Sequence, residues 1–485
     1  MTHDLSRSAV STRRGSMYRM FTVSVLAFLC LGFAAVGSAG AAGGGTDYLD
    51  ASDRTAMAGI SPDPWRIGPH PVPEFSAVVA SRAYPGVFWA VRDASKGKDR
   101  LTAAQDGKDC PYNTLKDDAV CTRLRNRART QLWAYKLAGG QLATWNTSLS
   151  GVDPANPYFR RFTLPRTSPT APAYALTATY AALADDPNQL MNNDWEGIAV
   201  NHRTGKLSIA ATGTFPSPSP LCNNRRVIEV NEPVPGGSSN QYQPTLVRDL
   251  PNYATSATTT NCNGEALFWL DDAATSTGRL YLIEKRVRKY NHPRILEIGL
   301  GAGSGRAVGA PRAAAPAWVS AHLLNLPPNV PTTVGGAPVP LDEALEVTGA
   351  DVSQNGRRAV ITLGNCGFLV YDSPTAPAMY GVLRDNDDNA ATADPAAERP
   401  GYRLYGNATR ADDVVQRHSC QTRPFGVAPW SQDDGAAFGF QPGPMGIEGV
   451  TFVANTNYLS MVEDTTFLDS SGRTVLGSRM LRIVP

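Results

Sequence analysis

Acidic residues stand beside small residues at the start of several apolar segments. The clearest case is the acidic pair of Asp194-Trp195-Glu196-Gly197, which runs into Ile198-Ala199-Val200. Carboxylates that meet in one place repel each other, which favours proton uptake or a bound cation. Calcium suits such a place because it accepts six to eight oxygen ligands in irregular geometry. The sequence therefore predicts a calcium site formed by Glu74, Asp93, Asp194, Glu196, Glu265, Asp351 and Glu448.

The same pattern has a structural interpretation, which the sequence leaves open. A carboxylate at the start of a strand can accept hydrogen bonds from backbone N–H groups of a neighbouring repeat and so hold the repeats together. A repeated residue specifies a structural role as readily as a functional one.

A dense basic run follows one of the apolar segments, from Glu284 to Lys289. Lysine and arginine at this point could hold an anionic substrate, although such a run is also typical of a solvated strand end. With calcium activating a water molecule, the candidate catalytic residues are Glu196, Glu265, Lys285 and Arg286. The sequence has no Gly-x-Ser-x-Gly and no His-Glu-x-x-His, so it lacks the usual hydrolase signatures. His202 is expected on the surface, in a hairpin turn.

A repeated unit predicts the architecture that would position these residues. An apolar strand, a turn with Gly-Lys or Gly-Arg, and a second apolar strand recur around Gly205, Gly278 and Gly356. Short strands with turn signals and internal repetition favour a β-propeller over a β-sandwich. The acidic residues recur at intervals of about 70 to 120 residues, longer than a minimal blade of roughly 40–50. We therefore expect an all-β fold, a six-bladed β-propeller with long decorating loops at 94–128, 214–262, 299–343 and 373–440.

The N-terminus predicts export. Arg13, Arg14 and Arg19 precede an apolar run that ends in small residues, as in a signal peptide. We expect a cleaved signal peptide at 1–41, an extended lead-in at 42–73 and a single propeller domain at 74–485. The protein would then be a secreted or periplasmic monomer, without a membrane segment after cleavage and by an export route that stays open. A net charge of +2 leaves no basic excess for a nucleic-acid partner.

Removal of the signal peptide would leave six cysteines, an even number that suggests three disulfides in an exported chain. The sequential pairing is preferred because each pair would close a segment between core motifs: Cys110–Cys121, Cys222–Cys262 and Cys366–Cys420.

Taken together, these motifs resemble those of exported bacterial six-bladed propellers described as phytase-like, with "esterase-like activity of phytase". The residues that carry the resemblance lie between Glu74 and the C-terminus, and Asp194-Trp195-Glu196 is the most specific of them. One departure is the stretch Ala211-Thr212-Gly213-Thr214, where the family tends to have Asp-Ile-Gly-Asp-Asn. An acidic contribution to a channel site is missing there.

Two functions follow as alternatives. The resemblance implies a calcium-dependent phosphoesterase or esterase that acts on a small anionic substrate, with its carboxylates at the mouth of the channel. The missing acid–base signatures favour a non-catalytic propeller that binds a protein or glycan partner in the envelope or outside the cell.

Overall fold

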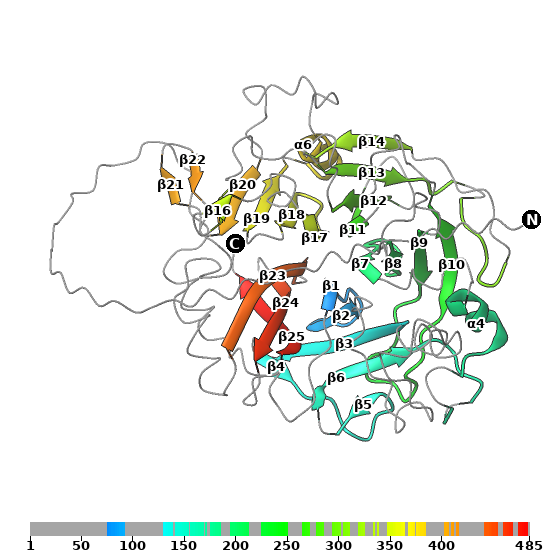
Figure 1. The fold of residues 1–485 in the computed structure, drawn as a ribbon. Helices are drawn as coiled ribbons and strands as arrows, with labels where there is room; N and C mark the ends of the chain where they lie inside the picture. Colours follow the sequence, from blue (N-terminus) through cyan, green and yellow to red (C-terminus); the bar gives the residue numbers. More distant parts are fainter. Residues whose placement is uncertain are drawn as a thin grey trace, which may run out of the picture. The chain divides into compact units, whose positions relative to one another are not determined.

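The computed structural model describes the chain between Phe75 and Ile483, with gaps (Figure 1). The longest gaps are residues 93–129, 186–194, 213–224, 251–263, 311–318, 325–332, 339–346, 385–401 and 417–440. The described residues form antiparallel sheets and a few short helical segments. The expected all-β class is therefore confirmed.

Five sheets of three or more strands are present in the described part of the chain. Sheet 1 has the order β1-β2-β3-β6-β5, with β4 beside β3. Its strands are β1 (Phe75–Ala80), β2 (Val87–Arg92), β3 (Gln131–Ala138), β4 (Gln141–Ala143), β5 (Val152–Asp153) and β6 (Asn156–Thr163). Sheet 2 follows a short helix, α4 (Ala178–Asp185), and comprises β7 (Trp195–Val200), β8 (Leu207–Ala211), β9 (Arg226–Val230) and β10 (Pro244–Asp249).

Like sheet 2, the other three large sheets are meanders, in which strands that follow one another in the chain are neighbours. Sheet 3 comprises β11 (Gly264–Leu270), β12 (Arg279–Glu284), β13 (Arg294–Ile298) and β14 (Ser320–Leu323). Sheet 4 comprises β17 (Val347–Val352), β18 (Arg358–Leu363), β19 (Gly367–Asp372) and β20 (Tyr402–Gly406). Sheet 5 comprises β23 (Gln441–Phe452), β24 (Leu459–Leu468) and β25 (Thr474–Ile483).

Smaller elements lie in segments that were expected to be loops. Residues 373–440 contain a 3-10 segment η3 (Ala376–Ala378), helix α6 (Met379–Leu383) and strands β20 to β22, while 214–262 contains β9 and β10. Segment 299–343 contains β14 and the pair β15 (Thr333–Val334) and β16 (Ala337–Pro338), and β21 (Thr409–Ala411) pairs with β22 (Val414–Gln416). These strands are short and hold Pro and polar residues, so period-2 alternation does not reveal them.

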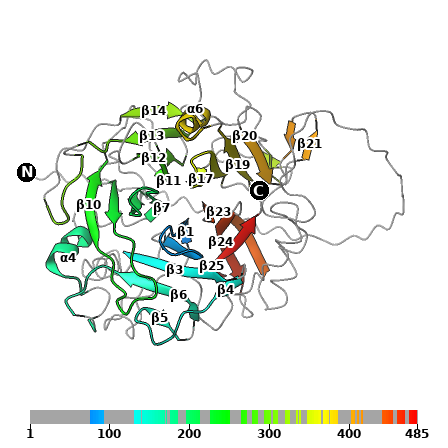
Figure 2. The ribbon, with the colours of Figure 1, turned by 180° about the vertical axis from the view of Figure 1, so that it is seen from behind.

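The first strands of the sheets pack against one another. β1 contacts β7 and β23, β11 contacts β7 and β17, and β17 contacts β23. Figure 2 shows the same elements from behind. In each of these five strands the register with the second strand shifts, which marks a β-bulge. β23 has two such shifts, and the second of them falls at Glu448. The bulged residues, called here the strand-start residues, are Ser76, Glu196, Glu265, Thr348 and Glu448.

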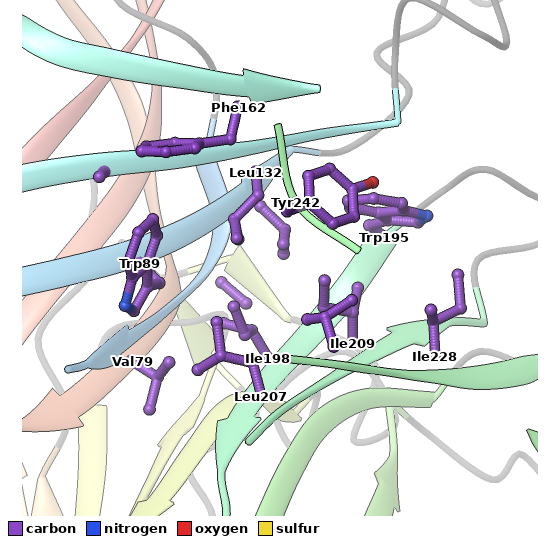
Figure 3. Packing of buried hydrophobic residues seen from close by; sticks show 14 of the residues in the cluster. Val79, Trp89, Leu132, Phe162, Trp195, Ile198, Leu207, Ile209, Ile228 and Tyr242 are labelled. Atoms are coloured by element: carbon purple, nitrogen blue, oxygen red, sulfur yellow. The ribbon is translucent and has the colours of Figure 1, made fainter. Parts of the chain in front are cut away.

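The core lies between neighbouring sheets. Side chains of sheet 1, such as Trp89, meet side chains of sheet 2, such as Ile198 and Ile209, in one buried cluster (Figure 3). A second cluster joins sheets 2 and 3 through Ala199 and Leu267, and a third joins sheets 3 and 4. First strands buried on both faces explain why their segments are continuously apolar instead of alternating.

The Gly-basic turns form as predicted. Gly205, Gly278 and Gly356 have φ of 70°, 74° and 66°, a region that glycine enters without steric cost. Ala138 pairs with Gln141, which closes the hairpin between β3 and β4.

The prediction of six blades is not confirmed. It rested on placing two repeats between Glu74 and Glu196, but the described residues of that interval form one sheet, sheet 1, and helix α4. Residues 93–129 of the interval lie outside the described residues, so the number of blades stays a prediction. The predicted signal peptide, the lead-in and all six cysteines of the predicted disulfides lie outside the described residues. No helix among those described is both long and apolar enough to cross a membrane.

Candidate functional site

The predicted carboxylates divide into three groups. Glu74, Asp93 and Asp194 lie outside the described residues, as does Arg286. Glu196, Glu265 and Glu448 are strand-start residues and share one structural position on β7, β11 and β23. Asp351 does not share it, because the bulge of β17 falls at Thr348, three residues earlier. The sequence pattern therefore aligned Asp351 with the wrong register.

The glycines that follow two of the strand-start residues, Gly197 and Gly349, have a packing role. A Cβ on Gly349 would lie 2.9 Å from the Glu448 carbonyl oxygen and 3.0 Å from the Gly449 Cα. A Cβ on Gly197 would lie 3.0 Å from Leu267 Cβ. Neighbouring first strands thus approach so closely that a larger residue would clash. The repeated acidic–small motif marks this close approach between sheets.

Cations of the protein itself accompany the carboxylates near the strand starts. Lys285 Nζ lies 3.1 Å from Glu265 Oε1, and the Glu265 side chain is buried. Beside it, Glu284 is fully buried and accepts two hydrogen bonds from Arg294, at 2.7 and 3.0 Å. Burial raises the pKa of Glu284, while the charges of Arg294 and Arg225 oppose that rise. Burial lowers the pKa of Arg225 to about 10.

Asp351 holds sheets together. Its Oδ2 accepts hydrogen bonds from Thr451 Oγ1 at 2.8 Å and from the Phe452 N–H at 2.9 Å, both on β23. Thr451 Oγ1 in turn accepts the Ala80 N–H of β1 at 2.8 Å. One chain of hydrogen bonds therefore joins β17, β23 and β1. This is the structural role that the sequence left open beside metal binding.

Two of the predicted calcium ligands, Glu265 and Asp351, have other partners in the structure, and Glu74, Asp93 and Asp194 lie outside the described residues, so the calcium site stays a prediction. Asp351 lies further along its strand than the strand-start glutamates, and its oxygens accept N–H and O–H donors. Glu265 is paired with Lys285. Within the described ranges, no three His, Cys, Asp or Glu residues are placed so that they could hold a metal ion. We therefore assign no chemical step to calcium.

A pocket of about 890 Å³ lies at the other end of the first strands. Four residues separate it from the strand-start residues, or roughly 13 Å at a rise of about 3.3 Å per residue. We call it the strand-end pocket. The last residues of β1, β7, β17 and β23 and the turns that follow them line it: Ala80, Ser81, Arg82, Val200, His202, Asp351, Val352, Ser353, Gln354, Asn355, Arg357, Arg358, Ser373, Thr451, Phe452 and Val453.

His202 links two turns of the pocket. Its Nε2 lies 3.2 Å from the Val352 carbonyl oxygen, which can only accept, so Nε2 donates. Its Nδ1 lies 3.1 Å from Arg82 Nη1 and accepts from that guanidinium. Burial lowers the pKa of His202, in agreement with this neutral tautomer. The expectation of a turn is confirmed, but the side chain is half-buried, not a free surface group.

Three arginines give the pocket its charge. Arg82 and Arg357 are exposed and Arg358 is half-buried. The buried carboxyl of Asp351 is the acid among the lining residues, and burial raises its pKa to about 6. The lining therefore carries a net positive charge. Sequence reasoning missed this site because Arg82, His202 and Arg357 come from turns far apart in the chain, and only the Gly-Arg turn at Gly356 gave a signal.

No protein-family model and no curated protein matches the sequence. Among solved structures, the chain is similar to a GH74 xyloglucanase from Xanthomonas campestris, with 9% identity and a TM-score of 0.27 over 86% of this chain and 37% of that chain. It is also similar to the beta-propeller domain of Cps50 (Swd1) from Myceliophteria thermophila, with 11% identity and a TM-score of 0.25 over 84% and 86%. A third similar structure is Sqt1 from Chaetomium thermophilum, with 11% identity and a TM-score of 0.21. The match covers 59% of this chain and 71% of that chain. The chain thus spans little more than a third of the xyloglucanase, and these likenesses carry no argument about its site.

Proposed function

We propose that the protein is an exported β-propeller in which five sheets form the blades and the strand-end pocket binds a small polar molecule. The single observation that carries the binding function is the pocket of about 890 Å³, lined from sheets 1, 2, 4 and 5. That size suits a small-molecule ligand, for which pockets of about 300–1,000 Å³ are usual.

The propeller architecture is supported by the pairwise packing of the first strands. β1, the first described strand, contacts both β7 of the next sheet and β23 of the last large sheet. The hydrogen bond from Ala80 to Thr451 joins the same two ends of the chain. Closure of this kind removes the exposed edges between the first and last blades. A density map of the purified protein that shows fewer or more than five blades would contradict the arrangement.

A non-catalytic role suits the pocket because of the partners its polar groups already have. Asp351 accepts three hydrogen bonds, from Val352, Thr451 and Phe452. These donors engage both carboxylate oxygens, so Asp351 is poorly placed to act as a general base. His202 uses both ring nitrogens, toward Val352 and Arg82. A general base needs a free lone pair within reach of a proton to be abstracted. The pocket is therefore better suited to recognition than to proton transfer.

Two matched variants of the full chain test binding at the pocket. Gln354 is exposed in the β17–β18 turn and lines the pocket, whereas Thr204 is exposed in the β7–β8 turn and does not. A panel of small polar molecules would be screened by thermal shift and confirmed by calorimetry. A ligand should bind the wild type and Thr204→Trp but lose affinity for Gln354→Trp. Equal binding by both variants would place its site elsewhere.

The calcium-dependent phosphoesterase remains the alternative prediction from the sequence. Its test is hydrolysis of p-nitrophenyl phosphate with calcium and with EGTA, in the wild type and in Glu196→Gln. Turnover that requires calcium and disappears in Glu196→Gln, with the fold intact, would favour the hydrolase. The packing of Lys285 against Glu265 leads us to expect no calcium-dependent turnover.

A further inference from the structure

We propose that the strand-end pocket is an anion-binding site in which Arg82 and Arg357 bind a carboxylate or phosphate group of a small molecule. This inference rests on the proposed function of the pocket and specifies its ligand. Guanidinium groups match both kinds of anion because their N–H donors form parallel hydrogen bonds with two oxygens.

Arg82 has a donor to offer and a support that orients it. Its Nη1 donates to His202 Nδ1, and His202 is anchored to the Val352 carbonyl oxygen through Nε2. This chain of hydrogen bonds holds the guanidinium at the pocket without neutralising its charge, since His202 is the acceptor and not a carboxylate. A preorganised cation loses less conformational entropy when a ligand binds.

Arg357 differs from the basic residues that follow the glycine in the two related turns. Lys206 pairs with Glu229 at 2.6 Å, and Arg279 pairs with Glu297 at 2.9 Å. Arg357 Nε instead lies 3.5 Å from the Ser373 carbonyl oxygen. In the part of the chain that the structure describes, neither Arg357 nor Arg82 forms an ion pair. The charge of both arginines is therefore available to a ligand.

The one carboxyl of the lining does not compete for these arginines. Asp351 Oδ1 accepts the Val352 N–H at 2.8 Å, and Oδ2 accepts from Thr451 and Phe452. Its buried side chain faces the junction of β17 and β23. Gln354 and Asn355, exposed on the turn beside Arg357, add amide donors that suit further oxygens of the same ligand.

Calorimetric titration of the full chain tests the inference with citrate, inorganic phosphate and glucose at constant ionic strength. Citrate and phosphate represent the two anion classes, and glucose is the uncharged polar probe. We expect at least one anion to bind, Arg82→Gln and Arg357→Gln each to weaken its binding at least tenfold, and added salt to weaken it further because both arginines are exposed. Whichever anion binds tighter identifies the class of the ligand.

Arg203→Gln is the matched control. Arg203 is exposed in the β7–β8 turn, pairs with Asp271 and does not line the pocket. The anion affinity of Arg203→Gln should therefore stay within about twofold of the wild-type value. Anion binding that persists in Arg82→Gln and Arg357→Gln would overturn the inference. If glucose or another uncharged molecule binds, depends on Gln354 and is not displaced by either anion, the anion inference fails and the pocket proposal stands. If neither an anion nor an uncharged molecule binds at the strand-end pocket, both the anion inference and the proposed function of the pocket are refuted.

Discussion

The first strands of the sheets have two ends with contrasting chemistry. Their starts gather buried carboxylates that are paired with the protein's own cations, as Glu265 is with Lys285 and Glu284 is with Arg294. Their ends open into a pocket in which Arg82 and Arg357 have no carboxylate partner among the described residues. The comparison shows that a repeated acidic motif can serve the packing of neighbouring sheets and need not bind a ligand. The groups available to a ligand lie instead where turns from several sheets meet.

The largest effect should follow from removing Glu284, the buried carboxylate at the end of β12 that lies opposite the start of β11. Glu284→Ala leaves Arg294 and the buried Arg225 without their anion. An uncompensated buried charge costs about 3–5 kcal/mol of unfolding free energy. Urea denaturation would measure the loss, with Asp271→Ala, whose partner Arg203 is partly exposed, as the milder control. Similar small losses in both variants would mean that the pairing of Glu284 with Arg294 contributes little to stability.

Asp351 at the strand ends should make stability depend on pH. Burial raises its pKa from 3.8 to about 6, so the folded state binds the proton more tightly than the unfolded state. The contribution to stability is fully present below pH 3.8 and is lost as pH rises through about 6, a fall of about 3 kcal/mol. The measurement is the free energy of unfolding between those pH values, compared with Asp351→Asn.

Asp351→Asn cannot ionise but keeps an oxygen that can accept the Phe452 N–H. The difference between the two proteins cancels the titration of other carboxyls, such as Glu284. We expect the wild type to lose stability relative to Asp351→Asn as the pH rises. Parallel curves would show that Asp351 has an ordinary pKa and would contradict the prediction.

Gly349→Ala should destabilise the protein by about 1–3 kcal/mol, the usual cost of overpacking. The new Cβ would lie 2.9 Å from the Glu448 carbonyl oxygen, and backbone atoms cannot move aside cheaply. Gly236→Ala is the control, because a Cβ there has no neighbour within 4 Å. Thermal melting would compare the two, and equal melting temperatures would contradict the close approach of β17 and β23.

The smallest expected effect is that of chelation. Because Glu265 pairs with Lys285 and Asp351 accepts hydrogen bonds from β23, we expect EGTA to leave the melting temperature of the purified protein unchanged. Elemental analysis of the same sample provides a second readout. A melting temperature that falls with EGTA, together with stoichiometric calcium, would support the predicted metal site. The strand starts would then bind a ligand as well as pack the sheets together.

Local signals carried much of the fold prediction. The continuous apolar runs around Ile198 and Leu267 predicted buried strands, and Gly205, Gly278 and Gly356 predicted turns with positive φ. Both depend on interactions a few residues apart, which a sequence reveals directly. Spacing did not decide the number of blades, because residues 93–129, which connect β2 to β3 of sheet 1, lie outside the described part of the chain.

Chemistry at a distance was decided by the tertiary structure. By itself the sequence determined the all-β class, the repeated strand–turn–strand unit and the presence of carboxylates at the strand starts, since these follow from local periodicity and residue type. Only the packing of β17 against β23 placed Asp351 on Thr451, and only the meeting of separate turns brought Arg82 to His202. Asp351 and Thr451 are 100 residues apart and Arg82 and His202 are 120 apart, so no local pattern in the sequence records these contacts.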